Sequence, residues 1–357
     1  MKPRLLFILP QQRPPYEIEM ITRFRRFDPS ILWYARDGLK VLGRSLPWRR
    51  ILSVESLEHF FVRRFGNRIT NAKLIVTLEL HSPESYLVSK CFPELQHVVL
   101  VWETLKNHPF YLVPPIGLQS RYISKSADHF IAFTRRSAAH LMSLGIDTSK
   151  ISVIYPGIDL TKFRPAYDRK RSGKVRFLYS GVLERHKGVD ILLQAFKRTN
   201  EPNFELTITG RGSLETMVRS AAANDDRIKF LGWLPQQERQ YVFRESDVFC
   251  CPSLDARFFF WKYWEEQFGF SLVEAMGSGL PIVSTNCGAI SEVVGSRNLI
   301  VPQGSVTSMA LALDTIGGDE GLRCQLGGEN RSRAEDLFDV ENQSRHLENA
   351  MIRLSAH

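Results

Sequence analysis

The feature that most constrains the fold is a repeated alternation of short apolar runs with amphipathic helical stretches. In residues 134–145, for example, apolar side chains recur at helical spacing, with Thr134 as a plausible N-cap and Gly145 as a stop. Near-continuous apolar strands that alternate with helices are typical of parallel sheets covered on both faces. The expected strands begin at Arg4, Ile31, Lys73, Val98, His129 and Ile151 in the first half, and at Val175, Phe204, Ile228, Val248, Pro281 and Leu299 in the second.

A polar segment that contains proline and glycine, Pro156–Lys174, interrupts this alternation. The chain of 357 residues is long enough for two domains of about 150–200 residues each. We therefore predict two doubly wound α/β domains, residues 1–165 and 166–335, whose sheets face each other across a cleft. The last stretch, residues 336–357, has a helical pattern and is expected to return to the N-terminal domain.

The composition is that of a soluble globular protein, with 43% hydrophobic and 24% charged residues. No apolar run approaches the roughly 20 residues that span a bilayer, and Leu5–Leu9 is too short for the core of a signal peptide. We therefore expect a cytoplasmic protein. The net charge is +9, and residues 1–70 hold fourteen Lys and Arg against six Asp and Glu. This excess indicates an anionic partner for the N-terminal part: a membrane surface, a nucleic acid or an anionic substrate.

The five cysteines are scattered and include no C-x-x-C. The adjacent pair Cys250 and Cys251 lies in an apolar run. We interpret all five as buried thiols of a protein in a reducing compartment.

Two glutamates, Glu266 and Glu274, lie on either side of a glycine that precedes a helical pattern. The free N–H groups and the dipole of a helix N-terminus attract anions. Gly269 would let the amides of Phe270 and Ser271 reach a diphosphate. Glu274, one turn into the helix, could accept two hydrogen bonds from a vicinal diol such as a ribose.

The same residues also allow a purely structural interpretation. Ser271 is expected near the N-cap, so Ser271-x-x-Glu274 has the form of a capping box, and Glu265-Glu266 could be a solvated pair. Glycines at predicted strand ends, Gly181 and Gly210, allow a close approach of backbone to ligand but also simply turn the chain.

The segment resembles the E-x7-E motif of the family 4 glycosyltransferases, which are retaining enzymes of the GT-B fold. The matching residues are Pro252-Ser253, Trp264, Glu266–Gly269, Glu274–Met276 and Ser278–Pro281. Upstream, Ser180–Phe196 resembles the donor-phosphate loop of that family. Downstream, Gly288–Gly295 and Leu299–Val306 are similar to the family pattern on the C-terminal side of the motif. The resemblance covers about residues 126–340, whereas the first 100 residues match only in strand pattern.

This resemblance implies transfer of a sugar from a nucleotide-diphosphate-sugar to a glycan or lipid-linked acceptor, with retained anomeric configuration. In the mechanism proposed for the family, the leaving phosphate helps to deprotonate the acceptor. The donor-side residues implied are Glu274 for the ribose, Glu266 for the transferred sugar, Gly269, Phe270, Ser271 and Leu272 for the diphosphate, Lys187 as its counter-cation, and Gly181 and Arg185 in the phosphate loop. No metal or other cofactor is then expected, because a cation and a helix dipole do the work of a metal.

The chain departs from the family pattern in two places. Val182 stands where the family often has arginine, so Arg185 would substitute for it or Lys187 would act alone. Pro10–Glu17 replaces the usual Gly-Gly loop, so the acceptor side is unusual. The catalytic candidates on that side are Glu103 and His108, and His81 is a further possibility.

Two other functions remain open from the sequence. A sugar-nucleotide epimerase on the same scaffold would need no separate acceptor. A basic nucleic-acid-binding protein would use the N-terminal part, but no recognisable nucleic-acid module is present, and we expect no nucleic-acid partner.

Three segments rich in aromatic and basic residues suggest further contacts. Arg257–Trp264 is either buried packing or a loop that contacts sugar or lipid. Gly38–Arg50 and Leu57–Arg68 mix Lys and Arg with apolar side chains, as helices at an anionic membrane do. In the second, an apolar stripe would lie beside arginines; its members are Phe60, Phe61, Val62, Phe65, Arg63, Arg64 and Arg68. This segment is then either a packed helix with a solvated basic edge or a membrane contact. In the second case the protein would be peripheral at the inner face of a membrane.

Overall fold

The computed structural model describes residues 2–9, 15–33, 54–106, 108, 111, 113–166, 173–199 and 201–355. The chain divides into two compact units. Unit 1 consists of Met1–Gly157 and Val340–His357, and unit 2 of Ile158–Asp339. The domain limits expected from the sequence, at 165 and 335, lie a few residues from these positions.

Unit 1 is built on a six-stranded parallel sheet in the order β2-β1-β3-β4-β5-β6. Its strands are β1 (Arg4–Leu9), β2 (Asp28–Trp33), β3 (Leu74–Leu78), β4 (Gln96–Val101), β5 (His129–Ala132) and β6 (Ile151–Val153). Its helices are α1 (Pro15–Thr22), α3 (Val54–Thr70), α4 (Pro83–Cys91), α5 (Ile116–Ser126), α6 (Arg135–Ser143) and α14 (Val340–Ser355). As predicted, Thr134 caps α6, since its side chain accepts a hydrogen bond from the Ser137 N–H.

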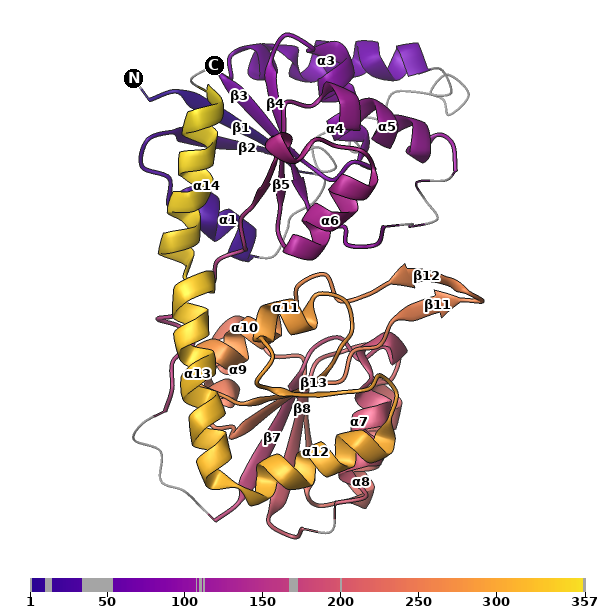
Figure 1. The fold of residues 1–357 in the computed structure, drawn as a ribbon, viewed down its shortest axis with the longest axis vertical. Helices are drawn as coiled ribbons and strands as arrows, with labels where there is room; N and C mark the ends of the chain where they lie inside the picture. Colours follow the sequence, from indigo (N-terminus) through magenta and orange to yellow (C-terminus); the bar gives the residue numbers. More distant parts are fainter. Residues whose placement is uncertain are drawn as a thin grey trace. The chain divides into compact units, whose positions relative to one another are not determined.

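The last helix, α14, packs against α1 within unit 1 (Figure 1). Ser344 Oγ donates to the Met20 carbonyl at 2.7 Å, and Glu348 Oε1 accepts from the Arg26 N–H at 2.5 Å. These bonds join residues more than 300 positions apart in the chain. They tie the C-terminal helix to α1 and to the segment between α1 and β2.

Unit 2 repeats the architecture with the strand order β14-β13-β10-β7-β8-β9, all parallel. Its strands are β7 (Val175–Ser180), β8 (Phe204–Thr209), β9 (Ile228–Gly232), β10 (Val248–Cys251), β13 (Ile282–Thr285) and β14 (Leu299–Val301). Its helices are α7 (Val189–Phe196), α8 (Glu215–Asn224), α9 (Gln236–Arg244), α10 (Phe270–Gly277), α11 (Ile290–Val294), α12 (Val306–Gly318) and α13 (Glu320–Phe338). The twelve predicted strands and the two doubly wound parallel sheets are thus confirmed.

One element of unit 2 was not expected from the sequence. The aromatic segment forms an antiparallel hairpin of β11 (Ala256–Phe258) and β12 (Trp261–Trp264), which make a two-stranded sheet of their own. Figure 1 shows this hairpin extending away from the parallel sheet of its own unit. The interpretation as buried packing is therefore wrong for most of its aromatic side chains, which are exposed.

The proposed apolar stripe on α3 is also wrong for two of its members. Phe61 and Phe65 are buried in the unit 1 core, where both rings pack together and Phe61 contacts Phe92. The helix turns these rings inward because residues four apart share a face. The arginines Arg63, Arg64 and Arg68 remain exposed. The segment Gly38–Arg50 and the side chain of Phe60 lie outside the described residues.

The cysteines are free thiols, and three of them, Cys250, Cys251 and Cys287, are buried as expected. Cys91 is half-buried, and Cys324 is exposed on α13, contrary to the prediction. Among the helices that the structure describes, we find none with both the length and the hydrophobicity needed to cross a membrane.

Candidate functional site

The donor-side candidates lie in unit 2, at the edge of the sheet where the parallel strands end. Gly181 directly follows β7, and Ser253 follows β10. The helix α10 connects the carboxyl end of β10 to β13, so its N-terminus opens at the same edge. Ligands of open parallel sheets bind at this edge.

Lys187 and Glu266 form an ion pair here. Lys187 Nζ lies 2.8 Å from Glu266 Oε2, and the same oxygen accepts a hydrogen bond from Ser253 Oγ at 3.0 Å. The ammonium group also lies 4.5 Å from the centroid of the Trp264 ring, as in a cation–π contact. Glu266 is buried, whereas 22% of the Lys187 side chain is exposed. The Lys187 ammonium group is thus held beside a buried carboxylate, and one side of the lysine is open to solvent.

The neighbouring His186 does not add a second positive charge. Burial lowers its pKa, and the nearby Lys187 cation lowers it further. Its ring packs on Trp264 with the centroids 4.3 Å apart. His186 is therefore a neutral packing residue at pH 7, and Lys187 supplies the charge.

Two glycines with positive φ bring these segments together. Gly188 (φ 69°) lies so close to Pro252 that an added Cβ would stand 2.0 Å from the Pro252 carbonyl oxygen. Gly288 (φ 54°) lies equally close to Glu266, since a Cβ added to this glycine would stand 2.1 Å from the Glu266 carbonyl oxygen. Only glycine fits either place without a shift of the backbone. Lys187 and Glu266 are thus held next to each other by residues that carry no chemistry of their own.

The N-cap of helix α10 lies two residues before the predicted position. Gly269, with φ 82°, is its N-cap, and no side chain caps the helix. The predicted N-cap at Ser271 and the capping box with Glu274 are therefore wrong, because the glycine makes the turn and Ser271 already lies inside the helix. Leu272 is fully buried, and its N–H donates to the Gly269 carbonyl at 2.9 Å. Phe270 and Ser271 are the half-buried residues of this first turn.

Glu274 is 2% exposed and is bound by an arginine from another helix. Its Oε1 accepts a hydrogen bond from Arg239 Nη2, on α9, at 2.5 Å. A carboxylate this deeply buried needs a charged partner to remain ionised. The Arg239 side chain is 30% exposed, so the arginine is the solvent-accessible member of this ion pair.

The phosphate-loop candidates Gly181 and Arg185 are both exposed. The Gly181 N–H donates to the Thr209 carbonyl at 3.1 Å, which fastens the loop to β8. Arg185 lies in a short 3-10 turn together with Lys187. The turn therefore presents two basic residues at the edge where α10 begins.

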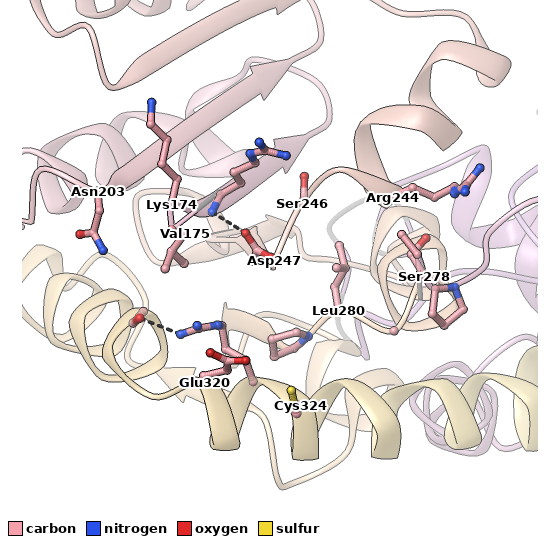
Figure 2. Close-up of a pocket in the computed structure, with 18 of the residues that line it drawn as sticks. Lys174, Val175, Asn203, Arg244, Ser246, Asp247, Ser278, Leu280, Glu320 and Cys324 are labelled. Atoms are coloured by element: carbon pink, nitrogen blue, oxygen red, sulfur yellow. Dashed lines mark hydrogen bonds between the residues drawn. The ribbon is translucent and has the colours of Figure 1, made fainter. Parts of the chain in front are cut away.

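A hollow at the opposite edge of this sheet is distinct from the site (Figure 2). It is lined by Lys174 and Val175 at the start of β7 and by Asp247 just before β10. Two of its charged groups are engaged: Asp247 accepts from the Arg176 N–H at 2.8 Å, and Arg323 donates to carbonyls near the end of α12. Because it adjoins the amino ends of the strands, we do not assign the donor to it.

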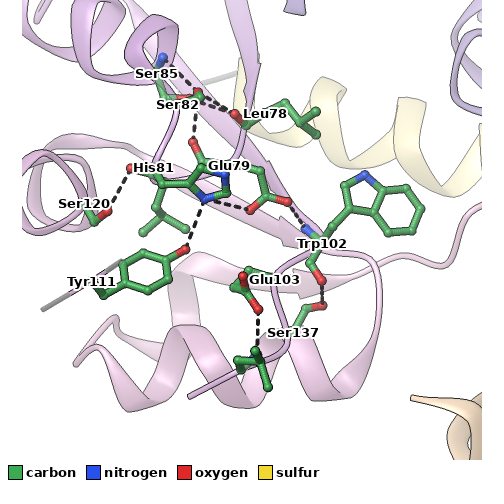
Figure 3. Close-up of polar contacts among 12 residues, drawn as sticks. Leu78, Glu79, His81, Ser82, Ser85, Trp102, Glu103, Tyr111, Ser120 and Ser137 are labelled. Atoms are coloured by element: carbon green, nitrogen blue, oxygen red, sulfur yellow. Dashed lines mark hydrogen bonds and ion pairs between the residues drawn. The ribbon is translucent and has the colours of Figure 1, made fainter. Parts of the chain in front are cut away.

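Unit 1 holds a second cluster of polar side chains (Figure 3). Glu79 follows β3, is buried and has φ 66°, a conformation that is uncommon outside glycine and often found at functional sites. Its Oε1 accepts from the Trp102 N–H at 2.8 Å, and its Oε2 lies 4.0 Å from His81 Nδ1. His81 Nδ1 is also 3.5 Å from the Tyr111 hydroxyl. Burial, with the charges of Glu79 and Glu103, raises the pKa of Tyr111, so its phenol stays neutral.

The predicted catalytic residues of unit 1 border this cluster. Glu103 is buried, and its Oε1 accepts hydrogen bonds from the N–H groups of Thr104 and Leu105, both at 2.8 Å. His108 is also buried, and its ring stands perpendicular to that of Tyr111 with the centroids 6.3 Å apart. Glu103 thus orders its own loop, and Tyr111 lies between His108 and His81.

Four residues of these two sites had no role assigned from the sequence: Arg239, Ser253, Glu79 and Tyr111. Ser253 was visible as part of a motif, and the acid side chain directly after β3 was a possible signal for Glu79. Arg239 lies 35 residues from Glu274, in a polar helical stretch without any local mark.

Comparison with known proteins gives a family match within unit 2 and relatives that match part of the chain. Residues 174–319 match the family described as Glycosyl transferases group 1. The chain is 31% identical over 225 residues to a D-inositol 3-phosphate glycosyltransferase of Arthrobacter sp. (strain FB24), covering 57% of this chain and 51% of that protein. It is 28% identical over 222 residues to the amylovoran biosynthesis glycosyltransferase AmsK of Erwinia amylovora, covering 60% and 54%. The matches thus span about half the length of these relatives.

Solved structures resemble the whole chain in fold. A glycosyltransferase from Rickettsia africae superposes with a TM-score of 0.77 at 16% identity, covering 99% of this chain and 98% of that one. Anabaena Alr3699/HepE, solved in complex with UDP, gives 0.74 at 17% identity, covering 99% and 100%. With the two parallel six-stranded sheets, these similarities establish the GT-B fold that the motif resemblance implied.

Proposed function

We propose that the protein is a retaining glycosyltransferase that moves a sugar from a nucleotide-diphosphate-sugar to a glycan or lipid-linked acceptor. The observation that carries the proposal is the Lys187–Glu266 pair, located where the uncapped helix α10 begins. It lies inside the segment that matches the group 1 glycosyl transferases. The solved relative HepE, which shares the fold, was crystallised with UDP and with UDP-glucose.

In this proposal the donor diphosphate binds between the turn that carries Arg185 and Lys187 and the first turn of α10. The amides of Phe270 and Ser271 and the helix dipole face the phosphates. Lys187, with one side open to solvent, exchanges part of its contact with Glu266 for a phosphate oxygen. Gly181 lets the donor approach the end of β7 closely.

Glu274 binds the ribose hydroxyls, and Glu266 contacts the transferred sugar. Glu274 is bound to Arg239 in this structure. Donor binding therefore involves a rearrangement in which the ribose shares or replaces that contact. The bond from Ser253 to Glu266 keeps the second carboxylate oriented while Lys187 moves.

The chemical step follows from these positions. The bond from the anomeric carbon to the diphosphate breaks, and its electron pair goes to the phosphate oxygen. The acceptor oxygen bonds to the anomeric carbon on the same face, and its proton passes to that phosphate oxygen. Lys187 and the α10 amides stabilise the charge that develops on the diphosphate. We propose that this cationic clamp serves without a metal ion.

The acceptor is proposed to bind in unit 1, where Glu103 and His108 remain the catalytic candidates. The names of relatives point to varied acceptors, from inositol 3-phosphate to phosphatidyl-myo-inositol and the polysaccharide amylovoran. The similarity to the first of these covers about half of that protein. We therefore propose only the chemical class of the acceptor, which is a hydroxyl group on a glycan or on a lipid-linked molecule.

The rival functions are not favoured. An epimerase would turn over the donor without an acceptor, and a nucleic-acid-binding protein would have no use for a lysine paired with a buried glutamate at the edge of a sheet. We expect one nucleotide-sugar in a panel to raise the melting temperature, because a ligand that binds only the folded state stabilises it by mass action.

Phosphorus NMR with that donor then tests turnover with and without added acceptor. Release of nucleoside diphosphate that depends on the acceptor supports the proposal. Isomerisation of the donor without an acceptor would contradict it, as would failure of every nucleotide-sugar to bind.

A further inference from the structure

The β11–β12 hairpin exposes a concentration of aromatic side chains that the proposed function does not use. The exposed fractions are 63% for Phe258, 83% for Phe259, 77% for Phe260, 52% for Trp261 and 50% for Tyr263. Two pairs of rings pack together, with centroids 4.8 Å apart for Phe258 and Phe259 and 5.1 Å apart for Phe260 and Trp261. Contiguous apolar surface of this kind marks an interaction site.

The aromatic residues follow an order along the hairpin. The two turn residues are Phe259 and Phe260, which carry no polar atom in the side chain. Behind them on β12, Trp261 and Tyr263 point to one face because successive side chains of a strand alternate. Phenylalanine thus occupies the tip, and the two aromatic residues with a polar group stand closer to the protein.

The turn keeps phenylalanine where another residue would be more stable. Phe259 has φ 53°, a left-handed conformation that costs a bulky residue free energy. Tight hairpin turns with a positive φ at the first position normally have glycine there. An aromatic side chain at this position is strained, and such strain is often found where a residue serves function.

The charges on the hairpin are basic. Residues 256–264 include Arg257 and Lys262 and no acidic side chain. Lys262 faces the protein, where it pairs with Glu265 at 2.8 Å and Asp255 at 2.9 Å. The side chain of Arg257 is 54% exposed and lies 3.6 Å from Asp255. An exposed cation beside the aromatic tip complements an anionic surface, as does the net charge of +9.

We propose that this hairpin inserts its tip into the interface of an anionic lipid bilayer. Phe259 and Phe260 enter the apolar boundary, Trp261 and Tyr263 lie at the level of the headgroups, and Arg257 contacts lipid phosphates. Trp and Tyr are the residues enriched at membrane–water interfaces, and buried apolar area together with attraction to anionic lipid sets the strength of such binding. The insertion is independent of the proposed sugar transfer, since lipid binding needs no turnover.

A glycan fits the tip less well. Sugar sites need polar partners for the hydroxyls beside an aromatic platform, and the side chains of the two turn residues have no hydrogen-bonding atom. A bilayer needs no such partner. The other end of the hairpin is rooted in the candidate site, because Trp264 contacts both His186 and Lys187. Insertion would therefore hold that site close to a lipid surface.

The test is co-sedimentation of the full chain with vesicles of phosphatidylcholine alone or mixed equally with phosphatidylglycerol. The key variant is Phe259→Gly with Phe260→Ser, which removes both tip rings. Glycine suits the positive φ, so this variant should melt no lower than the wild type. We expect its partition onto anionic vesicles to fall about a hundredfold or more, because each of the two phenylalanines loses an apolar burial worth more than a factor of about ten.

The matched control is Met217→Ser with Leu311→Ser, which removes two exposed apolar side chains from α8 and α12 of the same unit. Its partition should equal that of the wild type. Brominated lipids should quench the tryptophan fluorescence of the wild type, and Trp261→Phe should lose most of that quenching. Failure of the wild type to bind anionic vesicles, or equal binding by the tip variant, overturns the proposal.

Two further outcomes also overturn it. If the wild type self-associates without lipid and the tip variant is monomeric, the hairpin contacts a second copy of this chain. If the tip variant binds vesicles normally but loses affinity for a soluble oligosaccharide, the aromatic surface is a sugar platform. Failure of sugar transfer alone leaves the vesicle result unaffected, so the two proposals are tested separately.

Discussion

The two units have sheets of equal size but hold their buried carboxylates in different ways. In unit 2, Glu266 and Glu274 are paired with Lys187 and Arg239, long side chains that are partly exposed. In unit 1, Glu79 and Glu103 accept hydrogen bonds from backbone N–H groups of the segment that follows β4. The first arrangement uses partly exposed cationic side chains, and the second uses backbone N–H groups.

This difference has a chemical consequence. A lysine or arginine can exchange a carboxylate for the phosphate of a ligand without any change of fold, because one charged contact replaces another. A carboxylate bound by backbone N–H groups can be released only if its loop rearranges. The ion pairs of unit 2 therefore suit the anionic donor that we propose, whereas the carboxylates of unit 1 are held in place by the backbone. Substitutions in each unit, and a change of pH, test this contrast.

The largest effect is expected for Lys187→Ala. Loss of one preorganised donor to a developing charge typically costs about 3–4 kcal/mol in rate, so turnover should fall at least about a hundredfold. Lys229→Ala is the matched control, since Lys229 pairs with Glu205 on the sheet and not with the site. Steady-state kinetics checks both variants.

The same assay tests whether the clamp is free of metal. Chelation by EDTA should leave turnover unchanged. Full activity of Lys187→Ala, or loss of activity with EDTA, would refute the cationic clamp. If Arg185 shares the work, the double variant should lose much less than the product of the two single losses.

The second prediction separates the units by pH. His97 and His140, both in unit 1, are buried, and burial lowers their pKa values to about 3 and about 4. In the unfolded chain each titrates near its ordinary value of about 6.5. Below that pH the unfolded state binds protons that the folded state does not, so stability is full above about pH 6.5 and falls as the pH drops.

As the pH falls from 6.5 to 5, protonation of these two histidines in the unfolded state should lower the free energy of unfolding of unit 1 by about 2–3 kcal/mol. The pKa of His186 in unit 2 is also lowered, but it is a single and more exposed group. Calorimetry should show the unit 1 transition moving down more steeply with acid than the unit 2 transition, and His140→Asn should reduce that slope. Parallel shifts of both transitions would contradict the assignment.

Some of these features were predictable from the sequence because a local pattern records them. Strand positions were predictable because parallel strands buried on both faces leave apolar runs, as at Arg4–Leu9 and Val175–Ser180. The donor-side candidates were chosen because the motif resemblance marks Glu266, Glu274 and Gly269 together, and their roles stay a prediction.

The remaining features depend on contacts that no local pattern records. Arg239 reaches Glu274 across 35 residues, and the backbone bonds of Glu79 exist only once β3 and β4 are paired. The N-cap was misplaced because Ser271 satisfies a capping pattern, whereas Gly269 satisfies the geometry. The exposure of the hairpin could not be predicted, because aromatic runs occur both in cores and at surfaces.

The third prediction concerns Glu274→Ala. If the carboxylate binds a ribose, the variant loses charge-assisted hydrogen bonds worth about 1.5–3 kcal/mol each, and donor affinity should fall roughly tenfold or more. Arg239→Gln is the comparison: it should lower the melting temperature, because it leaves a buried charge unpaired, and still permit donor binding. Calorimetric titration with the donor measures both variants.

A lower melting temperature with unchanged donor affinity in Glu274→Ala would exclude the ribose role. It would leave the Arg239–Glu274 pair as a link between α9 and α10 only. The contrast between the units would then rest on Lys187 alone.

The smallest expected effect tests unit 1 directly through Glu79→Gln. The amide oxygen can still accept the bond from the Trp102 N–H, so the strained backbone should survive, but the negative charge facing His81 is lost. If this cluster binds the acceptor, the KM for acceptor should rise about threefold, the size of one modest hydrogen bond. Donor affinity should not change, because the proposed donor residues lie in unit 2. Glu94→Gln, an exposed change in the same unit, serves as the control. An altered donor affinity with an unchanged acceptor KM would reverse the assignment of the two units, since the fixed carboxylates would then serve the donor.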